Sequence, residues 1–361
     1  MSKKVNYHSI GELFCGPGGG GLGASLAKIE AAGETHCFKH SWASDLDLDT
    51  CKTYSKSVLL SNETLSEKVK CGDARELDLE NPNIFPTVEG FIFGFPCNDF
   101  SIVGETKGMS GKFGPLYKQG IRVLSRPDAP DWFLAENVSG LTSANKGIAF
   151  KTIIKEMSNA GYDLVAHKYK FEQYGVPQKR HRVIIIGIKK ELGLKFKVPK
   201  PFDYQISAKT ALKNIPEIAT HNERTRQSET VVERLKHLKA GQNAWQPDLP
   251  KHLQLNVKGA RLSNIYKRLL PNHPSYTVTG SGGGGTYMYH WEEPRALTNR
   301  ERARLQTFPD SFQFIGTRES IRKQIGMAIP PQGAKIILEA ILKTFAGITY
   351  EYIEPNLSIN N

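Results

Sequence analysis

The chain has 361 residues, 39% of them hydrophobic and 23% charged, as in a soluble protein with one large and one small domain. The longest strongly apolar run, residues 183–188, is too short to span a bilayer, and the N-terminus carries no apolar signal segment. The five cysteines form no CxxC pair, which favours a reducing compartment over a disulfide framework or a zinc site.

Net charge is +12, and residues 191–280 hold 15 Lys and Arg against 7 Asp and Glu. Concentrated basicity suits a polyanionic partner such as nucleic acid, because phosphate contacts release counterions. A solvated basic surface is the alternative interpretation of the charge alone.

The first half of the chain alternates between strand and helix patterns. Strands are predicted at residues 9–14, 90–95 and 132–135, and a further strand is predicted to end at residues 42–44. Helices are predicted at 22–32, 116–124 and 149–160. This alternation predicts a doubly wound, mostly parallel α/β sheet.

The second half departs from that pattern. Residues 164–171 and 182–188 flank a link too short for a helix, so we expect them to pair as the one antiparallel strand connection at one side of the sheet. Residues 191–290 are basic and weakly periodic, as expected of a second, smaller domain. Helices are predicted at 297–307 and 332–345, and the last sixteen residues read as a loose tail.

A glycine-rich loop, Phe14-Cys15-Gly16-Pro17-Gly18-Gly19-Gly20-Gly21, lies between the first strand and the first helix and contains GxGxxG spacing. Such a loop lets a ligand approach the backbone beside a helix N-terminus, although a flexible turn has the same composition. Asp45 and Asp73 follow later strands and are placed to bind a ribose and an adenine amino group. Two carboxylates suit an adenosine without phosphate, hence S-adenosylmethionine rather than a dinucleotide. Either could instead cap a helix.

Three further residues carry candidate chemistry. Cys97 follows an apolar strand within Gly94-Phe95-Pro96-Cys97-Asn98, Glu136 ends another strand, and Arg182 begins a later one. Ligands of such sheets bind at the carboxyl ends of strands, where a thiol and a carboxylate form a nucleophile and acid pair. Taken singly, each residue could be structural: an inert buried thiol, a buried ion-paired Glu, an arginine that binds phosphate.

In this order the motifs resemble those of the DNA (cytosine-5) methyltransferases of bacterial restriction–modification systems. The matching segments are the glycine loop, Asp45, Gly72-Asp73, Pro96-Cys97-Asn98-Asp99-Phe100-Ser101, Glu136-Asn137-Val138, Gln178-Lys179-Arg180-His181-Arg182, residues 295–310 and Gly326-Met327-Ala328-Ile329-Pro330-Pro331. The resemblance covers nearly the whole chain except residues 191–270, and it implies a Rossmann-like methyltransferase sheet with a separate DNA-recognition domain.

The resemblance implies sequence-specific methyl transfer from S-adenosylmethionine to C5 of a flipped-out cytosine in double-stranded DNA. Cys97 would add to C6 of the base, Glu136 would bond N3 and the exocyclic amine, and Arg182 would hold O2. The loop between Cys97 and Gly114 would close over the DNA. Met327 stands where the family usually has Asn, from which we expect altered cofactor affinity.

The same resemblance implies the remaining site residues. The cofactor set is Phe14, Gly16, Pro17, Gly18, Gly19, Asp45, Leu46, Asp73, Ala74, Pro96, Leu116, Ala328 and Ile329. The DNA-binding set is Asn98, Ser101, Lys107, Gln178, Arg180, Thr277, Gly282 and Gly283, and no metal is expected. Further candidates for phosphate or guanine contacts are Arg224, Arg226, Arg261, Lys267 and Arg268.

We expect a catalytic domain of residues 1–190 and 318–361, and a target recognition domain with hinge at 191–317. The expected protein is a monomer in the cytoplasm, bound to the nucleoid through DNA and not to a membrane, with a cognate restriction endonuclease that needs no contact with it. Three alternatives remain: a tRNA-methylating relative, a catalytically inactive DNA-binding relative and a dehydrogenase. The last leaves Cys97, Glu136 and Arg182 without a role.

Overall fold

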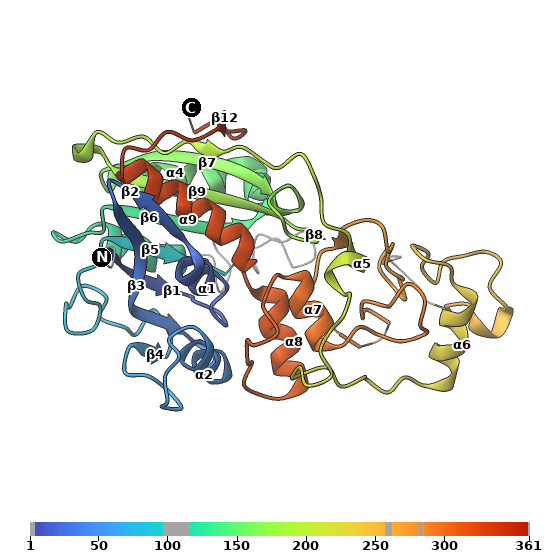
Figure 1. The fold of residues 1–361 in the computed structure, drawn as a ribbon. Coiled ribbons are helices and arrows are strands. Elements are labelled where there is room, and N and C mark those ends of the chain that lie inside the picture. Colours follow the sequence, from blue (N-terminus) through green and yellow to red (C-terminus); the bar gives the residue numbers. More distant parts are fainter. Residues whose placement is uncertain (1–3, 97–115, 257–261, 281, 284, 360–361) are drawn as a thin grey trace. The chain divides into compact units, whose positions relative to one another are not determined.

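The computed structural model describes residues 4–96, 116–256, 262–280, 282–283 and 285–359. The chain forms two compact units (Figure 1): unit 1 comprises Met1–Lys170, His181–Pro201 and Pro331–Asn361, and unit 2 comprises Phe171–Arg180 and Phe202–Pro330. Residues 171–180 and 318–330, expected with the catalytic domain, therefore pack within the second unit.

Unit 1 is built on an eight-stranded sheet in the order β2-β3-β1-β5-β6-β9-β7, with β4 also paired to β3. The strands are β1 (Val5–Leu13), β2 (Lys28–Ala31), β3 (Glu34–Asp45), β4 (Val69–Cys71), β5 (Gly90–Phe93), β6 (Trp132–Val138), β7 (Tyr162–Lys170) and β9 (His181–Lys189). Strand β5 is buried along its whole length, as expected for a central strand of a sheet that is covered on both faces.

The sheet is mixed: two of its strands, β2 and β9, run antiparallel to their neighbours, whereas one such strand was predicted. Strand β9 runs antiparallel to both β6 and β7, which confirms the predicted pairing of these segments. Strand β2 is also antiparallel to β3, so the prediction of one antiparallel strand, and of helix continuing to residue 32, is wrong. The reason is local: Ile29 is buried between exposed neighbours, and Ala32 (φ 50°) with Gly33 (φ 81°) forms the two-residue turn that joins hairpin strands.

Among the described residues of unit 1, the α-helices are α1 (Gly19–Leu26), α2 (Leu48–Ser57), α3 (Tyr117–Leu124), α4 (Ile148–Asn159) and α9 (Pro331–Phe345). Helices α1 and α9 pack closely because Gly23 has no side chain; a Cβ there would lie 2.5 Å from Cβ of Ala334. The predicted tail contains a short strand, β12 (Tyr352–Ile353), antiparallel to β10 (Val198–Pro199), so it is not loose throughout.

Unit 2 is mostly irregular. Its elements include β8 (Gln178–Lys179), α5 (Ala208–Ala211), α6 (Glu229–His237), β11 (Ser275–Tyr276), α7 (Asn299–Leu305) and α8 (Arg318–Met327), and β8 pairs with β11 in parallel. A small apolar core includes Leu235, Leu249, Ile265 and Tyr289. The stretch Arg318–Phe345 is apolar enough to cross a membrane by composition, but 67% of its apolar window is buried, as in the core helices of a globular protein.

Candidate active site

Glu136 and Arg182 form an ion pair at neighbouring strand ends of unit 1. In the β6–β9 register Glu136 faces Ile184 and Val138 faces Arg182, so the two side chains are diagonal neighbours on one face. Nε of Arg182 lies 2.9 Å from Oε1 of Glu136, and each side chain is 13% exposed. The structure thus brings together two of the three predicted catalytic residues, 46 positions apart in the chain.

The segment that leads to Cys97 lies beside this pair. Strand β5 runs parallel to β6 with Phe93 opposite Ala135, and the chain continues through Gly94. A Cβ on Gly94 would lie 3.4 Å from Oε2 of Glu136, and Nδ2 of Asn137 donates to the Phe95 carbonyl at 3.2 Å. Cys97, Asn98, Ser101 and Lys107 themselves lie outside the described residues, so their roles remain predictions.

The glycine loop turns sharply between β1 and α1. Phe14 (φ 57°), Gly16 (φ 55°) and Gly18 (φ 95°) all adopt left-handed backbone conformations. A Cβ on Gly18 would meet Cγ2 of Val58 at 2.3 Å, whereas one on Gly16 would meet nothing within 4 Å. Gly18 is therefore required for packing, and Gly16 faces open space in which a ligand can reach the backbone.

Asp45 joins the end of β3 to this loop. Its Oδ2 accepts a hydrogen bond from the Gly16 amide at 3.0 Å and its Oδ1 accepts one from the Asp47 amide at 3.1 Å. Burial raises the pKa of the Asp45 carboxyl. The helix cap is Asp47, which accepts from the Thr50 amide at 2.9 Å, so Asp45 is not the cap of α2. The exposed apolar side chain of Leu46 follows it directly.

The other predicted cofactor residues of unit 1 differ in their exposure and in their contacts. Asp73 is engaged by Arg75, whose Nε lies 2.9 Å from Oδ1, so an adenine contact would have to share this carboxylate. Phe14 is partly buried against the apolar core. Pro17, Gly19, Ala74 and Leu116 are buried, and Pro96 is partly buried.

Glu12, which was not among the predicted site residues, lies near the end of β1 under the glycine loop. The residue is 3% exposed and accepts a hydrogen bond from the Tyr54 hydroxyl at 2.9 Å. A Cβ on Gly20 would lie 2.6 Å from its Oε1, so the carboxyl group packs directly against the first turn of α1. Burial raises the pKa of Glu12 to about 8. The available signal was an acidic residue in the buried second half of β1, two positions before the loop.

In unit 2, Gln178 and Arg180 are buried, at 0% and 1% exposure. Gln178 accepts from the Val278 amide at 2.7 Å and donates to the Leu305 carbonyl at 3.1 Å. Arg180 donates to the carbonyls of Val278 and Gly326, each at 3.1 Å. The structure therefore speaks against direct DNA contact by either side chain, because both are used to hold the backbone around residue 278.

The remaining motif residues of unit 2 are also placed. The Thr277 hydroxyl donates to the Lys179 carbonyl at 2.6 Å, and Gly282 and Gly283 are half-buried. Met327 is 64% exposed at the end of α8. Ala328 donates its amide to the Gln324 carbonyl at 3.2 Å and accepts from Nε2 of Gln306 at 3.3 Å, and Ile329 is half-buried.

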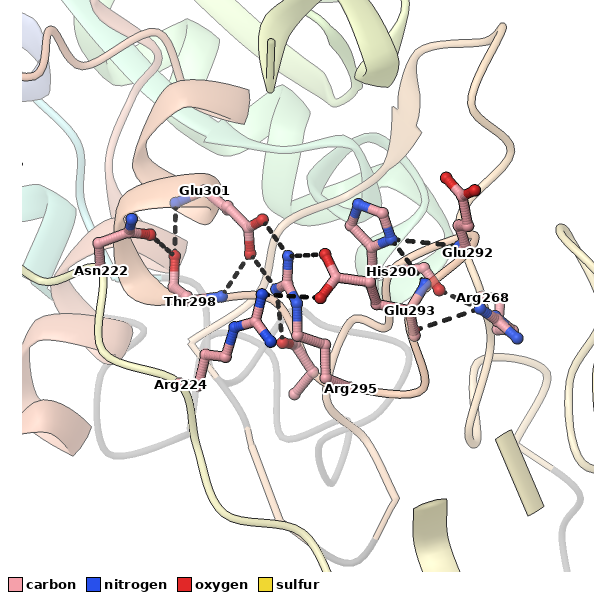
Figure 2. A network of polar contacts seen from close by, with 10 residues as sticks. Asn222, Arg224, Arg268, His290, Glu292, Glu293, Arg295, Thr298 and Glu301 are labelled. Carbon is pink, nitrogen blue, oxygen red and sulfur yellow. Dashed lines mark hydrogen bonds and ion pairs between the residues drawn. The ribbon is translucent and has the colours of Figure 1, made fainter. Parts of the chain in front are cut away.

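Figure 2 shows a polar network that ties residues 222–224 to the start of α7. Arg295 donates to both carboxylate oxygens of Glu301, at 2.7 and 2.8 Å, and Glu301 completes a capping box with Thr298. Glu293 accepts from Arg295 and pairs with Arg224, whose side chain is 68% exposed. Arg224 thus remains a candidate DNA contact at the rim of an otherwise internal network.

Arg268 belongs to the same network but, unlike Arg224, it is buried. It is 5% exposed and donates to the carbonyls of His290, Leu235, Leu238 and Glu293 at 2.7–3.2 Å. The expectation of a phosphate or guanine contact by Arg268 is wrong, since its guanidinium is enclosed by backbone. Arg226 is exposed, Lys267 lies over the Tyr276 ring at 5.4 Å, and Arg261 lies outside the described residues.

Unit 1 has a carboxylate–guanidinium pair at its strand ends and a glycine loop held by an aspartate, and this arrangement is consistent with an α/β methyltransferase fold. The family model for C-5 cytosine-specific DNA methylase matches residues 8–343, and the chain belongs to this family.

Among individual relatives, the chain is 55% identical over 351 residues to Type II methyltransferase M.BbvI of Brevibacillus brevis, covering 95% of this chain and 93% of the relative. It is 37% identical to Type II methyltransferase M.NgoFVII of Neisseria gonorrhoeae, with 98% and 91% covered. A solved prophage-encoded DNA modification methyltransferase from E. coli matches with a TM-score of 0.71 and 25% identity, over 94% of this chain and 99% of that one.

Proposed function

We propose that this protein is a sequence-specific DNA cytosine-5 methyltransferase, the modification enzyme of a restriction–modification system. The main support for this proposal is the Glu136–Arg182 ion pair, with Nε and Oε1 2.9 Å apart, beside the segment that leads to Cys97. The chain belongs to the cytosine-specific methylase family. A carboxyl group and a guanidinium on one strand face can bind the polar edge of a planar base at several atoms at once.

The residues have complementary roles in the proposed reaction. Sulfur of Cys97, as thiolate, bonds to C6 of cytosine and makes C5 nucleophilic, while Glu136 bonds N3 and the exocyclic amine and Arg182 holds O2. C5 then takes the methyl group, the C5 proton leaves to a water-derived base, and the bond between sulfur and C6 breaks. A stacked base cannot reach these groups, so the cytosine must leave the helix.

The glycine loop and Asp45 fit the adenosine part of S-adenosylmethionine, which supplies the methyl group. The fit rests on the open space above Gly16 and on the carboxylate of Asp45 beside it. Asp45 would accept the ribose hydroxyls, and the exposed Leu46 and half-buried Phe14 would contact the adenine.

Unit 2 would recognise the target sequence in double-stranded DNA. Its basic 202–280 segment and the motif around Thr277, Gly282 and Gly283 support this role. Gln178 and Arg180 would position that motif rather than touch DNA. The protein would act as a cytoplasmic monomer at the nucleoid. A cognate endonuclease would cleave the same DNA site without contacting the methyltransferase.

The decisive experiment uses duplex DNA that carries 5-fluorocytosine at the methylated position, found by bisulfite mapping in cells that express the protein. Wild type with S-adenosylmethionine should form a covalent DNA complex at Cys97, because fluorine blocks loss of the C5 substituent. Cys97→Ala should form no such complex and transfer no methyl group, yet still bind DNA. Turnover by Cys97→Ala, or methylation of tRNA in place of DNA, would overturn the proposal.

A further inference from the structure

Two cysteines from different elements of unit 1 meet beneath the turn that carries Asp45. Cys51 lies in α2 and is 0% exposed, whereas Cys71 ends β4 and is exposed. In the parallel β3–β4 pairing Cys71 lies opposite Asp45. Sγ of Cys51 donates to the Asp45 carbonyl at 3.4 Å, and Sγ of Cys71 donates to the Leu46 carbonyl at 3.7 Å. The two thiols therefore bind consecutive carbonyls of one turn.

The two thiols are also neighbours of each other. Burial, then the charge of Asp45, raises the pKa of the Cys51 thiol, and the hydrogen bond that it shares with Cys71 adds to the rise. A disulfide requires two cysteine side chains that point toward one another from closely spaced backbone positions. The shared hydrogen bond meets the first requirement, and the pairing of both thiols with the 45–46 turn meets the second.

The thiol pair supports both carboxylates of the proposed cofactor site. The Asp45 carbonyl that accepts from Cys51 also accepts from the Gly72 amide at 3.0 Å, so one oxygen holds α2 and the segment that leads to Asp73. A bond between the two sulfurs would remove both thiol hydrogens from the carbonyls of the turn. It would also draw the end of β4 toward α2, and so change the positions of Asp45 and Asp73 together.

We propose that Cys51 and Cys71 form a reversible disulfide when hydrogen peroxide reaches the exposed Cys71, and that this modification weakens the binding of S-adenosylmethionine. Sulfur of Cys71 takes one oxygen of the peroxide and becomes a sulfenic acid, while the O–O bond breaks and water leaves. Sulfur of Cys51 then bonds to sulfur of Cys71, the S–O bond breaks, and a second water leaves with the thiol proton. The two thiols lose two electrons, which reduce the peroxide to two waters. The effect on the cofactor rests on the proposed function, but the disulfide itself does not.

The test exposes the full chain to hydrogen peroxide, blocks the remaining thiols and maps the cysteines by mass spectrometry without reduction. We expect a peptide pair joined through Cys51 and Cys71. We also expect Kd for S-adenosylmethionine to rise about fivefold, the equivalent of one lost hydrogen bond, and to recover after treatment with dithiothreitol. Cofactor binding is measured in place of methyl transfer, because methyl transfer also depends on the thiol of Cys97.

Cys51→Ser keeps a donor for the Asp45 carbonyl but cannot form the disulfide, so peroxide should leave its Kd unchanged. Cys71→Ser, at the exposed position, should give the same result and serves if Cys51→Ser proves unstable. The matched control is Cys37→Ser, which removes a half-buried thiol of β3 opposite Tyr7 and Lys28 and should respond to peroxide as wild type does.

Three results would overturn the inference: absence of the linked peptide after peroxide treatment, unchanged cofactor affinity in the disulfide-bonded protein, or an equal loss of affinity in both serine variants of the pair. Failure of the reduced wild type to bind S-adenosylmethionine would instead overturn the proposed function. The peptide map decides on the disulfide in either case.

Discussion

At the scale of single residues, the Glu136–Arg182 pair shows how strand register assembles a site from distant positions. Neither residue is near the other in sequence, but an antiparallel pairing offset by two residues places both on one face. The two side chains are largely enclosed, where a charged hydrogen bond is stronger than at the surface. Each member therefore fixes the geometry of the other.

Glu136→Gln tests this pair. The amide can still accept from Arg182, but it cannot supply a proton toward N3 of the base, so we expect kcat for methyl transfer to fall by about 10²–10⁴. The control is Glu80→Gln, which disrupts a carboxylate–arginine pair with Arg122 that is 61% exposed at the carboxylate. Tritiated methyl transfer at saturating DNA would measure both; normal turnover by Glu136→Gln would contradict the assigned role.

At the scale of elements, β1, the glycine loop and α1 form a unit around Glu12. The carboxyl group fills the space that the absent side chains of Gly20 and Gly21 leave, and Tyr54 of α2 donates to it. Tyr54 in turn lies 3.2 Å from Nδ1 of His40 on β3. The turn that shapes the proposed cofactor site is thus supported by a buried polar chain.

Glu12 should make stability depend on pH. Because its pKa is raised from 4.5 to about 8, the folded state keeps a proton that the unfolded state has lost between those values, and stability falls as pH rises through that window. The limit is about 1.4 kcal/mol per pH unit. Urea unfolding between pH 6.5 and 8 should show this slope, because the lowered pKa of His40 affects stability only between about 4 and its ordinary value of 6.5. Glu12→Gln should flatten it; an unchanged slope would exclude a protonated Glu12.

The β3–α2 junction separates two aspartates with different roles. Asp45→Ala should raise KM for S-adenosylmethionine, because Asp45 faces the glycine loop, while Asp47→Ala should leave KM unchanged. Loss of the Asp47 cap should instead lower the free energy of unfolding by about 0.5–2 kcal/mol. Steady-state kinetics and urea unfolding of both variants check this assignment, which the reverse pattern would contradict.

At the scale of the whole molecule, the net charge of +12 overstates the basic surface. Unit 2 has little regular structure, so its carbonyls need donors other than a helix or sheet. Buried arginines supply them: Arg300 donates to Thr220, Pro309 and Phe312, as Arg268 and Arg180 do elsewhere. This use of guanidinium groups explains why a basic composition did not identify the DNA-facing side chains.

The parts of the fold predicted from the sequence are those that local pattern controls. Buried strands such as β5 and β6 and apolar-faced helices such as α4 and α9 were predicted with nearly their observed bounds. The hairpin strand β2 was missed because its four residues follow helix-compatible alanines and glycines. Glu12 was missed because burial of a charged residue depends on contacts across the fold, which neither spacing nor composition reveals.

The division of unit 2 into two stretches of chain has a consequence for exchanging specificity between relatives. The stretch 171–180 carries the amide and the guanidinium that grip Val278, which belongs to the other stretch. A chimera that receives only residues 202–330 from a donor would combine the donor's loop around residue 278 with the host's Gln178 and Arg180. Transplanting both stretches together keeps the loop and the two side chains that bind it from one parent.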